Sequence, residues 1–321
     1  MRALFVMDPL STIHVDKDSS YALMLEWQKR GGEVWHCGPG DLWSVGDEVF
    51  ATASRLQVGP RPKVADVLET ATLDTSTCRV VFKRTDPPFD MTYIFCTYLL
   101  DLIARRVPVV NAPHALRDAN EKMLITRFPE LIVPTLVTRD QARIRSFLEE
   151  QGGRAVVKPW DGNGGRGIFV LEAHDKNLSS MLETSTADGQ DFVMVQRYIP
   201  EIIEGDKRII LVDGVPKGAF VRIPPKNDHR GNMHVGASVE PCEMTERDLR
   251  ICDALKPFLV ENDLIFTGID VIGGWLTEVN VTSPTGIQEC ARLYGSDIAA
   301  DIVDAALTRP LGQPESAGEA T

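Results

Sequence analysis

The fold is decided by residues 155–170, which read AVVKPWDGNGGRGIFV. An apolar run ends in Lys158, four glycines follow between Gly162 and Gly167, and a second apolar run begins at once. This order predicts a strand, a glycine-rich loop and a second strand. Closely spaced glycines let successive backbone N–H groups turn toward an anion, and the lysine adds a positive charge, so the stretch favours a phosphate ligand.

Neither of the common phosphate-binding motifs fits this stretch. A Walker A loop places Gly-Lys-Ser/Thr at the start of a helix, and a dinucleotide fingerprint places G-x-G-x-x-G there. Here the lysine precedes the glycines and a strand is expected after them. On these residues alone, an exposed glycine-rich hairpin is as good an interpretation as a phosphate loop. The rest of the chain has to separate the two.

The composition is typical of a soluble globular protein. The 321 residues are 43% hydrophobic and 25% charged, and the length allows roughly two or three domains. The net charge of −12 argues against nucleic acid or an anionic membrane as a partner, because both favour a basic surface. The apolar runs at residues 93–100 and 3–7 are too short for a membrane span and a signal peptide. Six scattered cysteines without a C-x-x-C pair predict reduced thiols and a cytoplasmic location.

The first third of the chain predicts an α/β domain. The expected elements are a strand at residues 2–7, a helix at 18–31, a strand at 33–37, a short meander at 41–58, a strand at 79–84, a helix at 92–105 and a strand at 108–111. Open α/β sheets bind ligands beyond the carboxyl ends of their strands. The charged residues expected there are Asp16, Lys17, Asp18, Arg84 and Asp86. By themselves they are most simply interpreted as solvated loop charges.

The rest of the chain predicts an α+β lobe and then a sheet with a long loop. The expected elements are a helical stretch at 115–128, strands at 133–138, 155–158, 168–171 and 192–198, helices at 140–151 and 176–184, strands at 209–212 and up to 223, a helix at 245–261 kinked or delayed by Pro257, two strands within 265–281, and a helix at 296–307. Residues 224–236 are polar and lack periodicity, which is typical of a functional loop. Its basic residues, Arg230 among them, suit a lid over an anionic ligand.

A second group of polar residues lies in the strands predicted within 265–281. Asp270, Glu278 and Asn280 carry oxygen-bearing side chains in otherwise apolar segments, where an unpaired carboxylate is unfavourable. Glu278 and Asn280 are two residues apart and therefore share a face of their strand. A strict two-residue turn would point Asp270 to the opposite face, so we predict an odd-numbered loop or a β-bulge that brings the three together.

These three residues allow two interpretations. Two carboxylates and an amide suit Mg²⁺, with phosphate oxygens and water completing the coordination. Alternatively, Asp270 and Glu278 pair with nearby arginine or lysine, an interpretation that a phosphate loop in the same chain weakens. The six histidines show no ligand spacing, so a zinc site or a Ser-His-Asp hydrolase has little support.

The order of the motifs resembles a known family. In sequence order the chain carries MDP at 7–9, KDSS at 17–20, KRTDPPFD at 83–90, LRD at 116–118, NEK at 120–122 and TEVNVTSP at 277–284. With Lys158 and the glycine loop between them, they resemble the ATP-grasp carboxylate-amine ligases and, among these, the bacterial glutathione synthetases. The similarity covers residues 3–307, all but the tail.

The resemblance implies a Rossmann-like α/β domain followed by a two-lobed ATP-grasp module. The implied divisions are an N-terminal domain at 1–119, a small lobe with the glycine loop at 120–199, a large lobe with the metal site and lid at 200–308, and a disordered tail at 309–321. Proteins of this kind are usually homotetramers.

The resemblance also implies roles for individual residues. Those implied for catalysis are Arg208, Arg222 and Arg230. Those implied for nucleotide binding are Lys122, Lys158, Gly162, Gly164, Gly165, Gln196, Arg197, Tyr198, Ile199 and Asp206. Those implied for the metal are Asp270, Glu278 and Asn280, and those for a dipeptide are Arg84 and Ser283. Mg²⁺ is the implied metal, with Mn²⁺ as an alternative, and ATP is the implied co-substrate.

The implied reaction joins γ-L-glutamyl-L-cysteine and glycine, with ATP converting a carboxylate to an acyl phosphate that the glycine amine attacks. Such phosphoryl transfer depends on positioning and charge neutralisation rather than on a covalent nucleophile. Two alternatives stay open: another ATP-grasp ligase, which joins D-alanines or adds amino acids to a peptide, and a catalytically silent ATP-binding protein. The complete set of arginines and metal ligands argues against silence.

Overall fold

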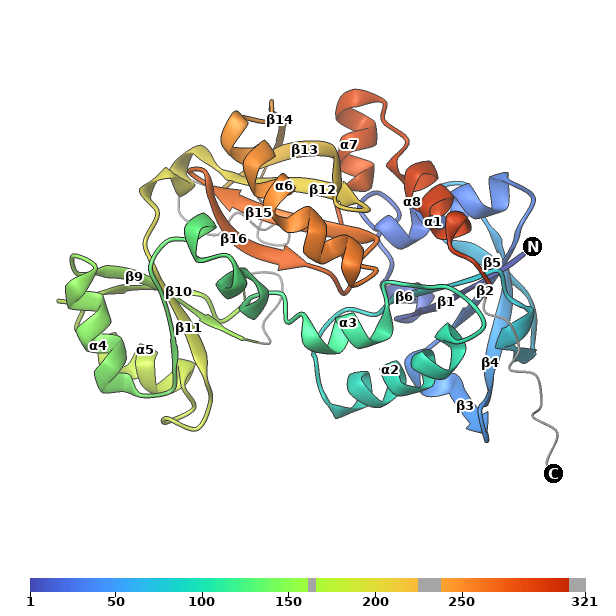
Figure 1. Ribbon diagram of the computed structural model, residues 1–321, viewed down its shortest axis with the longest axis horizontal. Coiled ribbons are helices and arrows are strands. Elements are labelled where there is room, and N and C mark those ends of the chain that lie inside the picture. The colour runs from blue at the N-terminus through green and yellow to red at the C-terminus, as the bar shows by residue number, and fades with distance from the viewer. Residues whose placement is uncertain (161–165, 225–237, 312–321) are drawn as a thin grey trace.

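The computed structural model describes residues 1–160, 166–224 and 238–311. Three β-sheets follow one another along the chain, with helices packed on their faces (Figure 1). Among the described residues, no helix is both long enough and apolar enough to cross a membrane.

The first sheet has a parallel centre and an antiparallel edge. Its strands are β1 (Arg2–Met7), β2 (Glu33–Cys37), β3 (Leu42–Val45), β4 (Glu48–Val58), β5 (Ala65–Asp74), β6 (Val80–Arg84) and β7 (Val109–Val110). The order is β3-β4-β2-β1-β6-β7, and β5 pairs with β4. The hairpin of β3 and β4 is the meander predicted at 41–58. β5 is absent from the predicted elements because most of its residues are exposed, so its sequence shows no apolar alternation.

Each of the first two helices begins with an aspartate cap. The side chain of Asp18 accepts a hydrogen bond from the first turn of α1 (Ser19–Lys29) at 2.6 Å, and Gly31 follows the helix with a φ of 77°. Asp90 caps α2 (Met91–Ala104) in the same way. The bounds of both helices are therefore close to the predicted ones.

The helical stretch predicted at 115–128 is broken. α3 (Pro113–Asp118) ends early because the side chain of Asn120 accepts hydrogen bonds from the N–H groups of Lys122 and Met123 and holds a turn. Two 3-10 turns follow, Met123–Arg127 and Pro129–Leu131.

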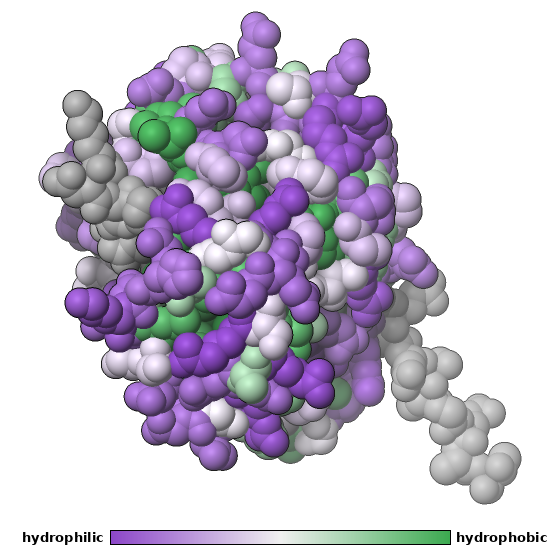
Figure 2. Space-filling view, turned by 90° about the vertical axis from the view of Figure 1, so that its left-hand side faces the viewer, coloured by the Kyte–Doolittle hydropathy of each residue, from purple (hydrophilic) through white to green (hydrophobic). Residues whose placement is uncertain are grey.

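The second sheet confirms the two strands predicted on either side of the glycines. Its strands are β8 (Thr135–Thr138), β9 (Arg154–Pro159), β10 (Phe169–Glu172) and β11 (Val193–Arg197), in the order β10-β9-β11-β8. All neighbours are antiparallel. α4 (Gln141–Glu150) and α5 (Leu178–Ser185) form a small apolar core with the sheet. Figure 2 shows that hydrophilic side chains dominate the outer end of this lobe.

The third sheet carries the second half of the predicted elements. Its strands are β12 (Asp206–Val212), β13 (Val215–Ile223), β14 (Ser238–Pro241), β15 (Phe266–Ile272) and β16 (Trp275–Asn280), in the order β14-β13-β12-β15-β16. α6 (Glu246–Glu261) contains Pro257 and runs past it, so the proline does not delay the helix. Asp213 and Gly214, both at positive φ, form the turn between β12 and β13.

Two helices near the end of the chain join the large lobe to the N-terminal sheet. α7 (Ile287–Tyr294) is an addition to the predicted elements, and α8 (Ile298–Thr308) is the helix predicted at 296–307. Both pack on α1 as well as on the third sheet (Figure 1). One apolar core therefore contains Trp27 and Phe82 from the first sheet and its helix together with Phe220 from the third sheet.

Candidate active site

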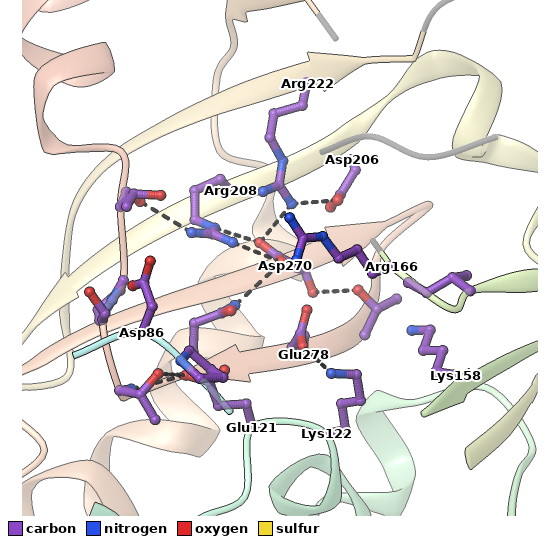
Figure 3. A pocket seen from close by; sticks show the side chains of 18 of the residues that line it. Asp86, Glu121, Lys122, Lys158, Arg166, Asp206, Arg208, Arg222, Asp270 and Glu278 are labelled. Carbon is purple, nitrogen blue, oxygen red and sulfur yellow. Dashed lines mark hydrogen bonds and ion pairs between the residues drawn. The ribbon is translucent and has the colours of Figure 1, made fainter. Parts of the chain in front are cut away.

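A cleft of about 1280 Å³ lies where the three sheets meet. Lys158 from the small lobe lines it together with Lys122, Asp270 and Glu278 (Figure 3). The glycine-loop strand and the oxygen-bearing strands therefore face the same space, as the ligase interpretation requires.

β15 and β16 place Asp270 directly opposite Glu278. Two glycines form a two-residue turn between the strands, and the register then shifts between Asp270 and Val271. The predicted β-bulge is therefore confirmed. Because Asn280 lies two residues beyond Glu278, all three oxygen-bearing side chains are on one face of the sheet.

Asp270 is held by two arginines. Arg208 contacts both carboxylate oxygens, with Nε 2.5 Å from Oδ1 and Nη2 2.9 Å from Oδ2. Arg222 places Nη2 3.0 Å from Oδ1. Burial alone would raise the pKa of Asp270, but the two arginines outweigh burial and lower it below its usual value. The carboxylate is therefore ionised at neutral pH.

Arg222 also pairs with Asp206. Burial, which outweighs the effect of this arginine, raises the pKa of Asp206 to about 6. Asp206 Oδ1 and Arg222 Nε are both buried and have no hydrogen-bond partner among the described residues. Each therefore keeps hydrogen-bonding capacity for a ligand.

Glu278 and Asn280 complete the oxygen-bearing face. Glu278 Oε1 lies 3.2 Å from Lys122 Nζ. Asn280 donates through Nδ2 to the backbone oxygen of Gly268 at 3.1 Å and to Asp270 Oδ2 at 3.3 Å. The described residues contain no cluster of three His, Cys, Asp or Glu side chains suited to a metal ion. The face nevertheless offers two carboxylates and one side-chain amide. Both kinds of group have oxygen atoms that suit a hard cation.

Lys158 forms the opposite wall with Gln196. Lys158 Nζ donates to Gln196 Oε1 at 2.8 Å, and burial lowers the pKa of Lys158. Three residues at the end of β11, where the small lobe joins the large lobe, also line the cleft and are called the hinge: Arg197, Tyr198 and Ile199. The guanidinium of Arg154 lies 3.9 Å from the centre of the Tyr198 ring.

Arg84 joins the N-terminal domain to this site. It is 4% exposed, and its Nε and Nη2 donate to Ser20 Oγ at 3.1 Å and to the backbone oxygen of Pro284 at 2.8 Å. The interpretation of Arg84 as a solvated loop charge is therefore wrong. Ser283 and Asp86 line the same part of the cleft, where burial raises the pKa of Asp86 and the nearby Ser283 and Arg84 oppose this.

Some predicted site residues lie outside the described residues. These are Gly162, Gly164, Gly165 and Arg230, with all of the predicted lid at 224–236 except Pro224.

Other residues that line the cleft are not among the predicted site residues. Arg166 extends from the end of the glycine loop toward Asp270 (Figure 3), and a cation within a glycine-rich stretch was a usable signal for it. Glu121 and Arg154 also line the cleft. Glu121 could have been found from its place beside Lys122 in the NEK motif, whereas Arg154 carries no such signal.

Solved structures share this fold at low sequence identity. The crystal structure of D-cycloserine synthetase DcsG matches with a TM-score of 0.67 at 15% identity, covering 95% of this chain and 98% of that one. A RimK domain ATP-grasp protein from Sphaerobacter thermophilus matches with a TM-score of 0.60 at 17% identity, covering 96% of this chain and 100% of that one. Together with a match to an ATP-grasp domain model over residues 121–295, these likenesses show that the chain has an ATP-grasp fold.

Sequence comparison gives the family. Residues 1–117 match the N-terminal domain of prokaryotic glutathione synthetase, and residues 121–295 match its ATP-grasp domain. Proteins named glutathione synthetase are 43% identical in Synechocystis sp. and 44% identical in Thermosynechococcus vestitus, each covering 94% of this chain and 98% of the relative. Another from Mesorhizobium japonicum is 44% identical over 93% of this chain and 96% of its own. The chain belongs to the prokaryotic glutathione synthetase family, whose ATP-dependent ligases make glutathione.

Proposed function

We propose that this cleft joins γ-L-glutamyl-L-cysteine to glycine through an acyl phosphate, with ADP and phosphate as the other products. The observation that carries the proposal is the shared cleft. Lys122 and Lys158 lie in it with the oxygen-bearing face of β15 and β16, and Arg208 and Arg222 contact the central carboxylate of that face.

The first step makes the dipeptide carboxylate reactive. A carboxylate oxygen of the cysteinyl residue bonds to the γ-phosphorus of ATP while the bond from that phosphorus to ADP breaks. Arg208 and Arg222 are the residues proposed to neutralise the charge on the transferred phosphoryl group. Arg222 Nε, which has no partner among the described residues, supports this role.

The second step forms the amide. The glycine nitrogen bonds to the activated carbonyl carbon, the bond to the phosphate oxygen breaks, and the amine loses a proton. Water competes with glycine for the acyl phosphate, so the site has to be covered during this step. Resemblance assigns Arg230 and the glycine loop to this covering role.

We assign the nucleotide to the wall formed by the small lobe and the hinge. Lys122 and Lys158 would contact its phosphates, and the backbone from Gln196 to Ile199, with the side chains of Arg197 and Tyr198, would meet the adenine. Asp206 would lie near the ribose or the cation. The support is that all of these residues line one cleft.

We assign Mg²⁺, with Mn²⁺ as an alternative, to Asp270, Glu278 and Asn280. The donor set fits, because hard oxygen ligands on one face suit these cations. When bound, such a cation supplies positive charge that stabilises phosphate oxygens. Arg84 and Ser283, from the other end of the cleft, are the residues proposed to hold the dipeptide.

Phosphate release tests the proposal. Purified protein with ATP and Mg²⁺ should release phosphate rapidly only when both γ-glutamylcysteine and glycine are present, and mass spectrometry should identify glutathione. A panel with D-alanine and peptide substrates is the parallel arm. Release that requires D-alanine would replace this assignment with another ATP-grasp ligase, and no stimulation by any substrate would favour a silent ATP-binding protein.

We also propose a homotetramer that associates through the N-terminal domain. Met91, Phe95 and Tyr98 lie on one face of α2 and are 60%, 63% and 50% exposed, which is unusual for large apolar side chains. Phe95→Glu should reduce the particle mass measured by light scattering, and an unchanged mass would exclude this face.

The domain division proposed from the resemblance places the boundaries near residues 119, 199 and 308. Limited proteolysis that cuts near these positions would support it. We assign the reaction to the cytoplasm, where the six free thiols would stay reduced.

A further inference from the structure

Glu121, between α3 and the 3-10 turn at Met123–Arg127, makes four hydrogen bonds to residues about 160 positions away. Its Oε1 accepts three hydrogen bonds: from Val281 N at 2.9 Å, Thr282 N at 2.9 Å and Thr282 Oγ1 at 2.8 Å. Its backbone oxygen accepts a fourth from Val279 N at 2.9 Å. One residue therefore holds the end of β16 and the loop that follows it.

The loop that follows β16, residues 281–285, is also held by two arginines. Arg84 from the N-terminal domain binds the backbone oxygen of Pro284 at 2.8 Å, and Arg208 from the third sheet binds the backbone oxygen of Thr285 at 3.1 Å. Ser283, proposed above to bind the dipeptide, lies between Thr282 and these two anchors. Glu121 supplies the anchor on the side of Lys122.

Glu121 is also next to the nucleotide wall in sequence and in space. Lys122 follows it directly and contacts Glu278 at 3.2 Å, and Figure 3 shows Glu121 and Glu278 on adjoining parts of the site. Burial and the nearby Glu278 raise the pKa of Glu121, whereas the hydrogen bonds from Val281 and Thr282 oppose this. Placing the buried carboxylate of Glu121 close to Glu278 is electrostatically unfavourable. The three hydrogen bonds that its Oε1 accepts are what this position provides in return.

We propose that Glu121 is a positioning residue that fixes the loop at residues 281–285 relative to the nucleotide wall. Its oxygen sets where Ser283 stands relative to Lys122, and so where the dipeptide carboxylate meets the γ-phosphate. Glu121 need not touch either reactant. This inference rests on the proposed function, because it concerns the alignment of its two substrates.

Steady-state kinetics of Glu121→Ala and Glu121→Gln test the proposal. The alanine variant loses three hydrogen bonds to the loop, so its KM for γ-glutamylcysteine should rise about tenfold or more and kcat should fall, while its KM for ATP changes less than about threefold. Glutamine keeps an acceptor oxygen in the same place and should restore the KM for the dipeptide to within about threefold of wild type. Glu130→Ala is the matched control, since Glu130 is exposed and contributes only its backbone oxygen to Arg247.

A purely structural role for Glu121 predicts a different pattern. Both KM values would then change together with the melting temperature, and glutamine would rescue nothing. Equal effects on ATP and dipeptide, no effect of Glu121→Ala, or failure of the glutamine variant to restore the dipeptide KM would each overturn the proposal. Binding of fluorescent ADP to the alanine variant, expected to match wild type, checks the nucleotide wall directly.

Thr282 gives a second route if the alanine variant does not fold. Thr282→Val removes only the Oγ1 bond and should raise the KM for the dipeptide about threefold to tenfold, and Thr282→Ser should restore it. Identical behaviour of the two variants would overturn the proposal. A wild-type protein that makes no glutathione would refute the proposed function instead, so the two failures are distinct.

Discussion

Replacing Lys83 with methionine should stabilise this protein, although it removes a charged residue beside the cleft. Lys83 lies in β6, is 1% exposed and has no hydrogen-bond acceptor for Nζ among the described residues. Its main compensation is the Tyr93 ring, whose centre lies 4.1 Å from Nζ. Burial of the amine lowers the pKa of Lys83 from 10.5 to about 8.

This pKa gives the size of the effect. Each pH unit corresponds to about 1.36 kcal/mol, so keeping Lys83 protonated in the folded state costs about 3 kcal/mol at pH 7. The cation–π contact offsets about 1 kcal/mol of this. Methionine has a similar length and no charge, so Lys83→Met should raise the free energy of unfolding by about 2 kcal/mol at pH 7.

The sign of the pH dependence follows from the same two states. Between pH 8 and 10.5 the unfolded lysine binds more protons than the folded one, so the wild type gains stability as pH rises through this window. Below pH 8 both states are protonated and the full penalty remains. The nearby thiols of Cys37 and Cys96 have pKa values raised by burial, so Lys83 dominates the difference in this window. The advantage of the methionine variant should therefore shrink between pH 7 and pH 10.

Urea unfolding followed by tryptophan fluorescence measures this difference. Trp27 is a suitable probe because it packs edge-on against Phe82, with ring centres 6.4 Å apart. Phe82 is the neighbour of Lys83 in β6. Lys176→Met is the control, since Lys176 is exposed and should shift stability by less than about 0.5 kcal/mol at either pH. A methionine variant that is less stable than wild type at pH 7, or equally favoured at pH 7 and pH 10, would refute the reasoning.

Three further predictions concern the site and its support. Glu278→Gln should weaken nucleotide binding and raise the Mg²⁺ concentration needed for activity while leaving the melting curve intact; an unchanged Mg²⁺ dependence would remove Glu278 from the metal site. Arg84→Lys should raise the KM for γ-glutamylcysteine about tenfold, because lysine cannot reach Ser20 and Pro284 together, and an unchanged KM would separate Arg84 from the dipeptide. Gly286→Ala should lower the melting temperature, since φ is 124° and a Cβ would lie 2.8 Å from the Phe220 ring, whereas Gly40→Ala, with open space around it, should not.

The sequence predicted the elements that form clear apolar runs or have good helix formers between clear ends. β1, β2, α1 and α2 are of this kind, and so is the strand pair around the glycines. β5 could not be found in this way, because an edge strand exposed on both faces has no apolar pattern. α7 is short and begins after Gly286, with no side-chain cap at its start, so the usual helix signal is missing.

The site was predictable where local geometry decides it. Asp270 and Glu278 can lie on one face across a two-residue turn only if one strand contains a bulge, and the structure has one. The contacts of Glu121 with Val281 and Thr282 were not predictable, because 160 residues separate Glu121 from Val281 and nothing in either segment indicates the other. A hydrogen bond between distant loops depends on how the domains pack, which single-sequence patterns do not encode.

The sequence left two interpretations of the carboxylates open, and the structure is compatible with both. Asp270 pairs with Arg208 and Arg222, and Glu278 pairs with Lys122, as the ion-pair interpretation expects. These cations are also the ones assigned to phosphate groups, and the carboxylates are the ones assigned to a metal. Before substrates bind, the two sets neutralise each other, which keeps buried charges stable. A nucleotide with its cation brings one partner for each set, so the same residues can exchange partners without leaving any charge uncompensated.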